Sequence, residues 1–421
     1  MSEKETASVA GHPGRDLPAP GRDLPVPRRD LPALTGLRFF AALLVFLAHA
    51  SLLYNPLDMS VPINLYRDQA IADNMAKIFA PAGFVGVSFF FVLSGFVLTW
   101  SRREKDTVTA FWRRRLLKIF PNHLVTWALT MILFAAAYTP VHAWLPNLFL
   151  LHSFSPRSDT NNSVNVPAWS LCSELLFYLL FPLIIRPLLR IADRRLWLWA
   201  GGAVAGVAVI ALLAQYVIPA GQSFALAPMP MTKMWFGYLF PPSRLFEFVL
   251  GILLARIVMA GLWPRISAWP IAVLAVAGYA AAVEVPAPYN FSLTTVVPIA
   301  VIICAVAAHD ARGERSVLRH PFLVWLGTIS FGMYMSQMIP IFYGRLELLG
   351  GATYSTPVAT GLLLLLLAAC VLLGWLLHAC VESPVMRRWG RSGTRPAPAP
   401  LPSADRSPDP AETPAAPGRP L

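Results

Sequence analysis

The stretch LTGLRFFAALLVFLAHA, residues 34–50, has the length and the apolar character of a membrane-spanning helix. Two polar side chains interrupt it, because Arg38 stands near its start and His49 near its end. Ionisable groups inside a bilayer are costly unless they are paired or hydrated, so both residues are candidates for function. At about 100° per residue, the steps from Arg38 to His49 return to within about 20° of the same helix face, roughly 16 Å along the axis. One face of this helix therefore presents a cation at one end and an imidazole deep in the membrane.

The rest of the chain has the same apolar character. Of its 421 residues, 56% are hydrophobic and only 13% are charged, a composition outside the range of ordinary soluble domains. Apolar runs of about 20 residues recur along the whole chain, so a single cleaved signal peptide does not explain them. We predict an all-α, polytopic transmembrane helix bundle with about ten spans, near residues 35–54, 80–101, 119–138, 167–187, 196–217, 243–260, 268–284, 292–309, 321–343 and 357–380.

The positive charges predict the orientation of this bundle. The net charge is +12, and Lys and Arg gather in alternate loops such as residues 101–118, 190–195 and 310–320. The intervening loops, such as residues 155–167 and 218–230, are nearly free of them. Basic loops face the cytoplasm, so we expect both termini to be cytoplasmic. The same rule explains the net charge without a nucleic-acid partner.

Both ends of the chain differ in composition from the bundle. Residues 1–33 repeat RDLP three times, and residues 391–421 are rich in Pro and Ala. Such segments are expected to be extended and disordered. We therefore expect one transmembrane domain, residues 34–390, between two disordered tails.

Several kinds of cofactor site are not indicated. Four cysteines (Cys172, Cys304, Cys370 and Cys380) lie in or beside apolar segments, with no CxxC pair and no His at ligand spacing, which argues against a disulfide framework and a zinc site. The chain has neither a phosphate-binding GxxxxGK[ST] loop nor a GxGxxG turn after a strand. We expect no bound metal or cofactor, and energy for any chemistry should come from an activated substrate.

The fourth expected span begins PAWSLCSELLFYLLFP, residues 167–182, and carries a line of polar groups. Ser170, Glu174 and Tyr178 recur every four residues and so share one helix face. Glu174 is the expected partner of His49, because a carboxylate can fix the tautomer of an imidazole that acts as a general base. The alternative is that Glu174 and His49 only tie helices together.

Other charged residues occupy span entrances. Arg115 and Lys118 lie one turn apart where the third span begins, which suits a polyanionic donor such as a phosphorylated nucleotide carrier, although loop charges of this kind also set topology. Arg244 and Glu247, three residues apart, more often stabilise a bundle than perform chemistry.

Seven motifs in this order resemble the membrane-bound acyltransferase family 3, whose members O-acylate carbohydrates, cell-envelope polymers and macrolides. They are LTGLRFFAALLVFLAHA, GFVGVSFFFVLSGFVLT, FWRRRLLKIFP, VPAWSLCSELLFYLLFP, RLFEFVLGILLA, LGTISFGMYMSQMIPI and VESP, spread over residues 33–390. The resemblance implies acyl-CoA as co-substrate, catalysis by His49, and donor binding by Arg38 and the basic motif with Arg115 and Lys118. It also implies a multi-pass protein of the bacterial plasma membrane with a hydroxylated glycan or metabolite as acceptor.

The chain departs from this family at two positions. Lys118 stands where the family usually has Arg, which keeps the charge but loses the bidentate fork. Gln337 stands where the family often has His, so no catalytic role is assigned to it.

Two other functions fit part of the pattern. A transporter or flippase could relay protons through the intramembrane His and Glu, but the two halves of the chain share neither the Arg/His nor the WSLxxE pattern. A non-catalytic membrane scaffold would not need His49 and Glu174 in facing spans.

Overall fold

The computed structural model describes residues 30–55, 58–103, 106–137, 139–223 and 229–390. The first helix begins at Pro32, two residues before the expected start of the domain. The expected tails lie outside the described residues, apart from residues 30–33. The three RDLP repeats therefore also lie outside them, except for Asp30, Leu31 and Pro32 of the third repeat.

Long helices form most of the described chain. They are α1 (Pro32–Ala50), α2 (Gln69–Trp100), α3 (Val108–Leu133), α6 (Trp169–Leu189), α7 (Leu196–Tyr216), α9 (Leu245–Met259), α10 (Ala268–Glu284), α11 (Val296–Ala311), α12 (Pro321–Ser336) and α13 (Thr356–Leu377). Each of the predicted spans overlaps one of these helices, which confirms the helical class. Short helices are α4 (Val141–Leu148), α5 (Ser158–Asn161), α8 (Met231–Met234) and α14 (Ser383–Trp389), and the strands β1 (Tyr54–Asn55) and β2 (Asp58–Pro62) pair in antiparallel orientation.

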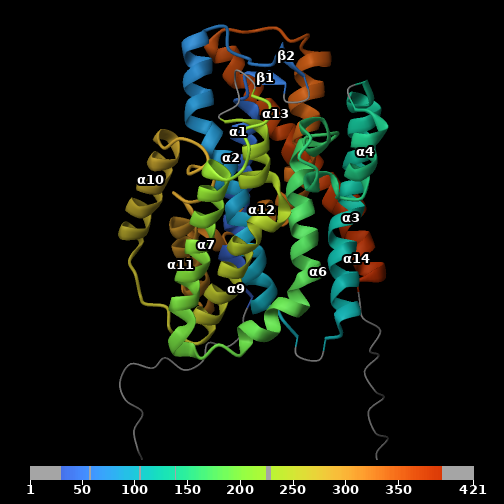
Figure 1. The fold of residues 1–421 in the computed structure, drawn as a ribbon. Helices are drawn as coiled ribbons and strands as arrows, with labels where there is room; N and C mark the ends of the chain where they lie inside the picture. The colour runs from blue at the N-terminus through green and yellow to red at the C-terminus, as the bar shows by residue number, and fades with distance from the viewer. Residues whose placement is uncertain (1–29, 56–57, 104–105, 138, 224–228, 391–421) are drawn as a thin grey trace, which may run out of the picture.

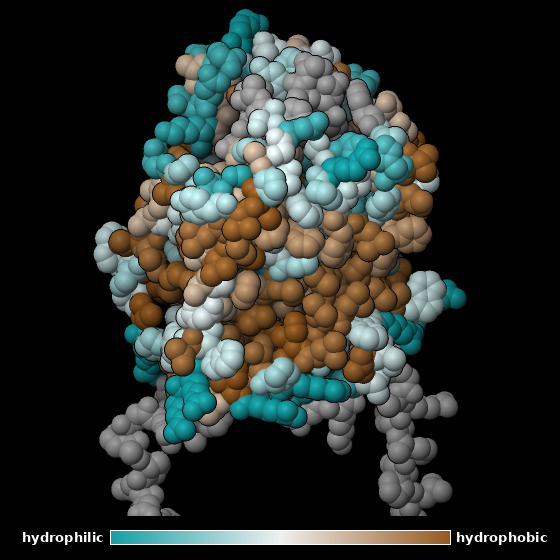
Figure 2. Space-filling view, in the orientation of Figure 1, coloured by the Kyte–Doolittle hydropathy of each residue, from teal (hydrophilic) through white to brown (hydrophobic). Residues whose placement is uncertain are grey.

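Fewer helices meet the length and apolarity of a membrane span than the sequence predicted. Within the described residues, six helical segments are long and apolar enough: α1, α2, α3 and the segments that contain α6, α7 and α13. A seventh span results if α12 is joined to the π-helix Ile339–Leu348, which follows it after a bend of 51°. Helices α10 and α11 are apolar but shorter. Figure 2 shows the corresponding belt of apolar side chains between two hydrophilic ends. The chain is therefore a multi-pass membrane protein, while the count of ten and the cytoplasmic termini stay predictions.

Glycines allow the central helices to approach closely. A Cβ atom on Gly95 of α2 would lie 2.0 Å from the carbonyl oxygen of Phe248, and one on Gly251 of α9 would lie 1.9 Å from that of Val92. A Cβ atom on Gly327 of α12 would likewise lie 1.8 Å from the carbonyl oxygen of Thr35 on α1. Small residues at such crossings are typical of membrane helix pairs. The contact of Gly327 brings α12 against α1 and so helps to set the direction of Arg38 and His49.

Loops that were predicted to lie on the same side of the membrane lie at the same end of the bundle. At the end that carries the α6–α7 loop, at the bottom of Figure 1, Arg256 pairs with Asp193 at 3.0 Å and Asp310 accepts a hydrogen bond from Ala33 N at 2.6 Å. At the other end, where β1 and β2 lie, Arg67 N donates to Tyr354 O at 2.9 Å. We call these the basic end and the opposite end.

Candidate functional site

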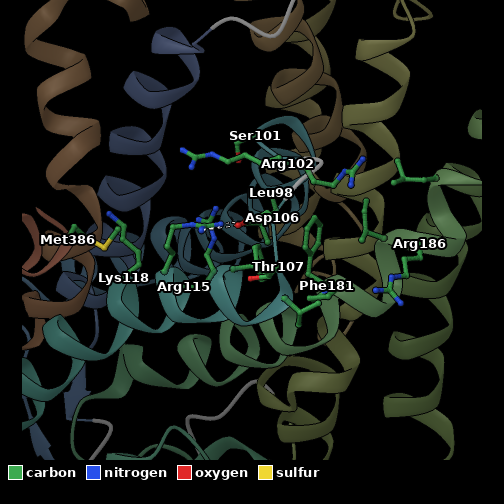
Figure 3. A pocket seen from close by; sticks show the side chains of 17 residues that line it. Leu98, Ser101, Arg102, Asp106, Thr107, Arg115, Lys118, Phe181, Arg186 and Met386 are labelled. Carbon is green, nitrogen blue, oxygen red and sulfur yellow. Dashed lines mark hydrogen bonds and ion pairs between the residues drawn. The ribbon is translucent and has the colours of Figure 1, made fainter. Parts of the chain in front are cut away.

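A pocket of about 470 Å³ opens at the basic end of the bundle. The end of α2, the first half of α3, the second half of α6 and Met386 of α14 form its walls (Figure 3). Arg115 and Lys118 line it from α3, as the sequence predicted for the mouth of the bundle. Arg186 reaches it from α6, across the pocket from Lys118 and Met386 in Figure 3.

The described lining of this mouth pocket is strongly positive. Its charged side chains are Arg102, Arg103, Arg114, Arg115, Lys118, Arg186 and, as the single acid, Asp106. Arg114 forms an ion pair with Asp106, which neutralises both groups. The Arg115 guanidinium lies over the rings of Phe111 and Tyr178, at 5.5 Å and 5.7 Å from their centroids. Stacking of this kind holds a guanidinium in place while its edge stays free for a phosphate.

Lys118 has a carboxylate partner that was not predicted from the sequence. Its ammonium group forms an ion pair with Glu382, which belongs to the π-helix His378–Glu382 between α13 and α14. Asn122 donates to the other carboxylate oxygen of Glu382 at 3.2 Å, and His378 lies 3.5 Å from the same group. Lys118 is therefore fixed in position at the mouth, and part of its charge is already balanced.

A second, smaller cavity of about 50 Å³ lies further inside the bundle. Arg38, Ser170 and Glu174 line it together with Tyr334 and apolar residues of α2, α6 and α12. Ser170 Oγ lies 2.7 Å from Tyr334 Oη, and Tyr178 donates to Glu174 at 3.1 Å. The predicted polar face of α6 is thus confirmed, because Ser170, Glu174 and Tyr178 follow one another along one side of the helix.

Arg38 links the two spaces electrostatically. Glu174 of the inner cavity and Glu382, the partner of Lys118, both act electrostatically on its guanidinium. Among the described residues, none is close enough to Arg38 for an ion pair or a hydrogen bond. Its donors are therefore available to a ligand, while two carboxylates help to compensate its charge.

His49 does not pair with Glu174. Among the described residues, the polar side chain that acts on His49 is that of Gln337, and Glu174 is not one of its neighbours. Instead, Glu174 takes its hydrogen bond from Tyr178 and faces Arg38. The physical reason is that Glu174 lies at the level of Arg38 on α1, well before His49. The predicted pairing was therefore wrong, whereas the role of each residue stays a prediction.

The surroundings of His49 leave hydrogen-bonding capacity unused. His49 Nδ1 and Gln337 Oε1 are both buried and make no hydrogen bond within the described part of the chain. Gln337 is held by its own Nε2, which donates to Tyr334 O at 2.9 Å. A buried polar atom without a partner is costly, so a small polar group such as a hydroxyl suits this position.

Arg244 and Glu247 form a separate, fully buried cluster. Their side chains lie 2.8 Å apart at 2–3% exposure. Arg244 also donates to Ser292 at 2.9 Å and to Ser88 at 3.1 Å. These contacts join α2, α9 and the segment before α11, so the structure supports a role in bundle packing.

Comparison with known proteins identifies the family. The profile described as an acyltransferase domain, Acyl_transf_3, matches residues 31–378. The chain belongs to the acyltransferase 3 family. It is 39% identical over 389 residues to acyltransferase MdmB of Streptomyces mycarofaciens, an alignment that covers 89% of this chain and 96% of that protein. It is 25% identical over 311 residues to peptidoglycan O-acetyltransferase OatA of Listeria monocytogenes, which covers 63% of this chain and 46% of that protein. No solved structure matches.

This acyltransferase 3 domain contains both the predicted residues and others that the sequence reading missed. Arg38, His49 and the α6 residues all lie inside the matched range, whereas Glu382 lies four residues beyond it. Glu382 and Asn122 could have been found from sequence, because Asn122 is a polar residue within α3 and Glu382 follows the apolar helix α13. Tyr334 gave no such signal, since tyrosine is ordinary in the apolar stretch that surrounds it.

Proposed function

We propose that this acyltransferase transfers an acyl group from acyl-CoA to a hydroxyl of a carbohydrate, a cell-envelope glycan or a macrolide-type metabolite. The observation that carries the proposal is the arrangement along α1. A positive pocket lies at the basic end. Further inside, the guanidinium of Arg38 lines the inner cavity, and His49, whose Nδ1 makes no hydrogen bond with the described residues, lies further along the same helix.

The mouth pocket suits the phosphorylated part of acyl-CoA. Its net positive charge and its volume fit a polyanionic nucleotide, and charge-assisted hydrogen bonds from Arg115 would hold the phosphates. The contacts continue inward, because Arg115 lies over Tyr178, Tyr178 bonds Glu174, and Glu174 lines the inner cavity with Arg38. The extended arm of the donor would follow this path toward His49.

In the proposed reaction, the His49 imidazole removes the proton of the acceptor hydroxyl. The hydroxyl oxygen then attacks the thioester carbonyl carbon, the carbon–oxygen bond forms and the carbon–sulfur bond breaks. The thiolate of CoA leaves and takes the proton back from the imidazolium, so protons and charge balance. Gln337 would orient the imidazole in the place that Glu174 was expected to fill. Glu174 would instead hold Arg38 in the donor path.

The direct test uses the purified protein in lipid nanodiscs with radiolabelled acetyl-CoA. Candidate acceptors are a macrolide with free hydroxyls and a peptidoglycan fragment, and mass spectrometry locates the ester. We expect labelled ester with wild-type protein and its loss in His49→Ala. Transfer of label that persists in His49→Ala would remove His49 from the mechanism. A protein that moves an acceptor across sealed vesicles without forming an ester would support the transporter instead.

A further inference from the structure

A third cavity, of about 760 Å³, lies outside the proposed site between α10 and α11. Helix α10 is weakly attached to the bundle. Its buried residues are Gly278 and Ala282, both in its second half. That half is also fastened by Tyr279, which donates to Ile78 O at 2.8 Å, and by Glu284, which pairs with Lys77 at 3.0 Å. The first half stands away from the other helices (Figure 1), and the cavity beside it forms a groove toward the basic end.

The walls of this groove are apolar where they face the middle of the bundle. Ile271, Ala272 and Ala275 of α10 face Ile302, Ala305 and Val306 of α11. The extended segment 263–267, which joins α9 to α10, borders the groove at the basic end. Its Trp263 stacks on Trp197 at 5.8 Å, and the neighbouring Trp269 is 75% exposed. Exposed tryptophans of this kind are typical of the membrane–water interface, so the rim of the groove lies at headgroup level.

The rim of the groove carries uncompensated positive charge. Arg265, Arg312 and Arg315 line it with a single acid, Glu314. Glu314 is already engaged by Arg312 at 2.5 Å and by His309 at 2.9 Å. Within the described part of the chain, Arg265 and Arg315 form no ion pair and no hydrogen bond. Arg265 also acts electrostatically on Glu314, so three guanidinium groups share one carboxylate and the opening of this apolar groove keeps a net positive charge.

We propose that this groove binds one anionic phospholipid. The acyl chains would lie against the α10 and α11 side chains, and the phosphate would lie between Arg265 and Arg315. Contact with apolar side chains favours the acyl chains, and basic pockets on the cytoplasmic side of helix pairs suit acidic headgroups. The bound lipid would also fill the gap that leaves the first half of α10 unsupported. The proposal does not depend on the acyltransferase chemistry.

Native mass spectrometry can test the proposal with phosphatidylglycerol as the probe and phosphatidylcholine as the reference. We expect wild-type protein to retain one phosphatidylglycerol in preference to phosphatidylcholine. Arg265→Ala with Arg315→Ala should weaken this retention about 30-fold, because each basic residue near an anionic lipid contributes about 1 kcal/mol. Ala305→Phe, which fills the apolar wall and keeps both charges, should also lower retention.

The matched control is Arg194→Ala with Arg195→Ala. These residues lie at the same end, in the turn Asp193–Arg195, are exposed and do not line the groove, and their removal changes the net charge equally. Retention should stay within about twofold of wild type. An unfolding midpoint equal to that of wild type without added lipid would show that the groove variants fold. Equal loss in the control, no preference for phosphatidylglycerol, or a second copy of the chain in place of lipid would each overturn the proposal.

Discussion

Lys118 on α3 and Glu382 at the end of the π-helix His378–Glu382 form an ion pair, although 264 residues separate them in the sequence. The Glu382 side chain is 5% exposed and receives a second hydrogen bond from Asn122. The pair joins the C-terminal helices to the helix that lines the mouth pocket. Donor binding and the packing of the last helices are therefore coupled through one carboxylate.

A double-mutant cycle can measure this coupling. Lys118→Gln and Glu382→Gln should each lower the free energy of unfolding, because each leaves a partly buried charge without its partner. We expect an interaction energy of about 1–3 kcal/mol, obtained from unfolding in detergent micelles. The control is the pair Lys77 and Glu284, which is 59% and 70% exposed and should give about 0.5 kcal/mol or less. Equal values for the two cycles would contradict a structural role for Glu382.

Donor affinity should depend on Arg115 and not on its neighbour Arg113. Arg115 lines the mouth pocket, whereas Arg113 is an exposed residue of the same helix outside the pocket. Loss of charge-assisted hydrogen bonds costs about 1.5–3 kcal/mol, so Arg115→Ala should raise the KM for acyl-CoA about 10- to 100-fold. Arg113→Ala should leave this KM nearly unchanged. Similar effects of both variants would mean that only the overall charge of the basic end matters.

Substitution of Arg38 and substitution of His49 should change different kinetic constants. Arg38→Ala should mainly raise the KM for acyl-CoA, because its guanidinium faces the donor path between the two cavities. His49→Ala should lower kcat by about 10²- to 10⁴-fold, the usual contribution of a general base, while donor binding persists in a direct binding measurement. If both variants raised only KM, His49 would belong to the donor site.

Gln337 should act as a positioning residue for His49. Gln337→Leu removes the polar neighbour of the imidazole and keeps a similar volume. We expect kcat to fall about tenfold with little change in KM, since the imidazole loses its orientation rather than its basicity. Gln337→His, which keeps a polar side chain at this position, should retain part of the kcat that Gln337→Leu loses. The measurement is steady-state kinetics for both substrates, and an unchanged kcat in Gln337→Leu would remove Gln337 from the site.

The sequence determined the helices better than their partners, for a physical reason. The length and apolarity of residues 34–50 are local properties, so the helix and the shared face of Arg38 and His49 could be predicted. Which neighbour meets each end of that face depends on helix crossings set by glycines such as Gly327. In the structure, Glu174 therefore lies near Arg38 and not near His49.

The remaining surprises also come from long-range packing. The bend of 51° after α12 gives the ninth predicted span two parts, with Gln337 between them. No local pattern around Gln337 indicates that its side chain reaches His49. The contact between Lys118 and Glu382 likewise depends on the fold of the whole bundle. Polar residues in apolar helices could thus be found from sequence, but their pairing with residues far away in the chain could not.

The buried pair Arg244 and Glu247 should matter for stability and not for substrate binding. Both side chains are at most 3% exposed, and Arg244 also bonds Ser88 and Ser292. Removal of one partner of a buried pair costs about 3–5 kcal/mol, because the other charge stays buried without compensation. Arg244→Met should therefore lower the unfolding midpoint strongly, and Glu247→Gln should do so as well.

The double variant should be more stable than either single variant, since no uncompensated charge remains. Thermal unfolding in micelles measures the order, and KM values of the surviving protein report on the site. A double variant less stable than both single variants would contradict this account of the buried pair, and a raised KM for acyl-CoA with unchanged stability would place the pair in the donor site instead.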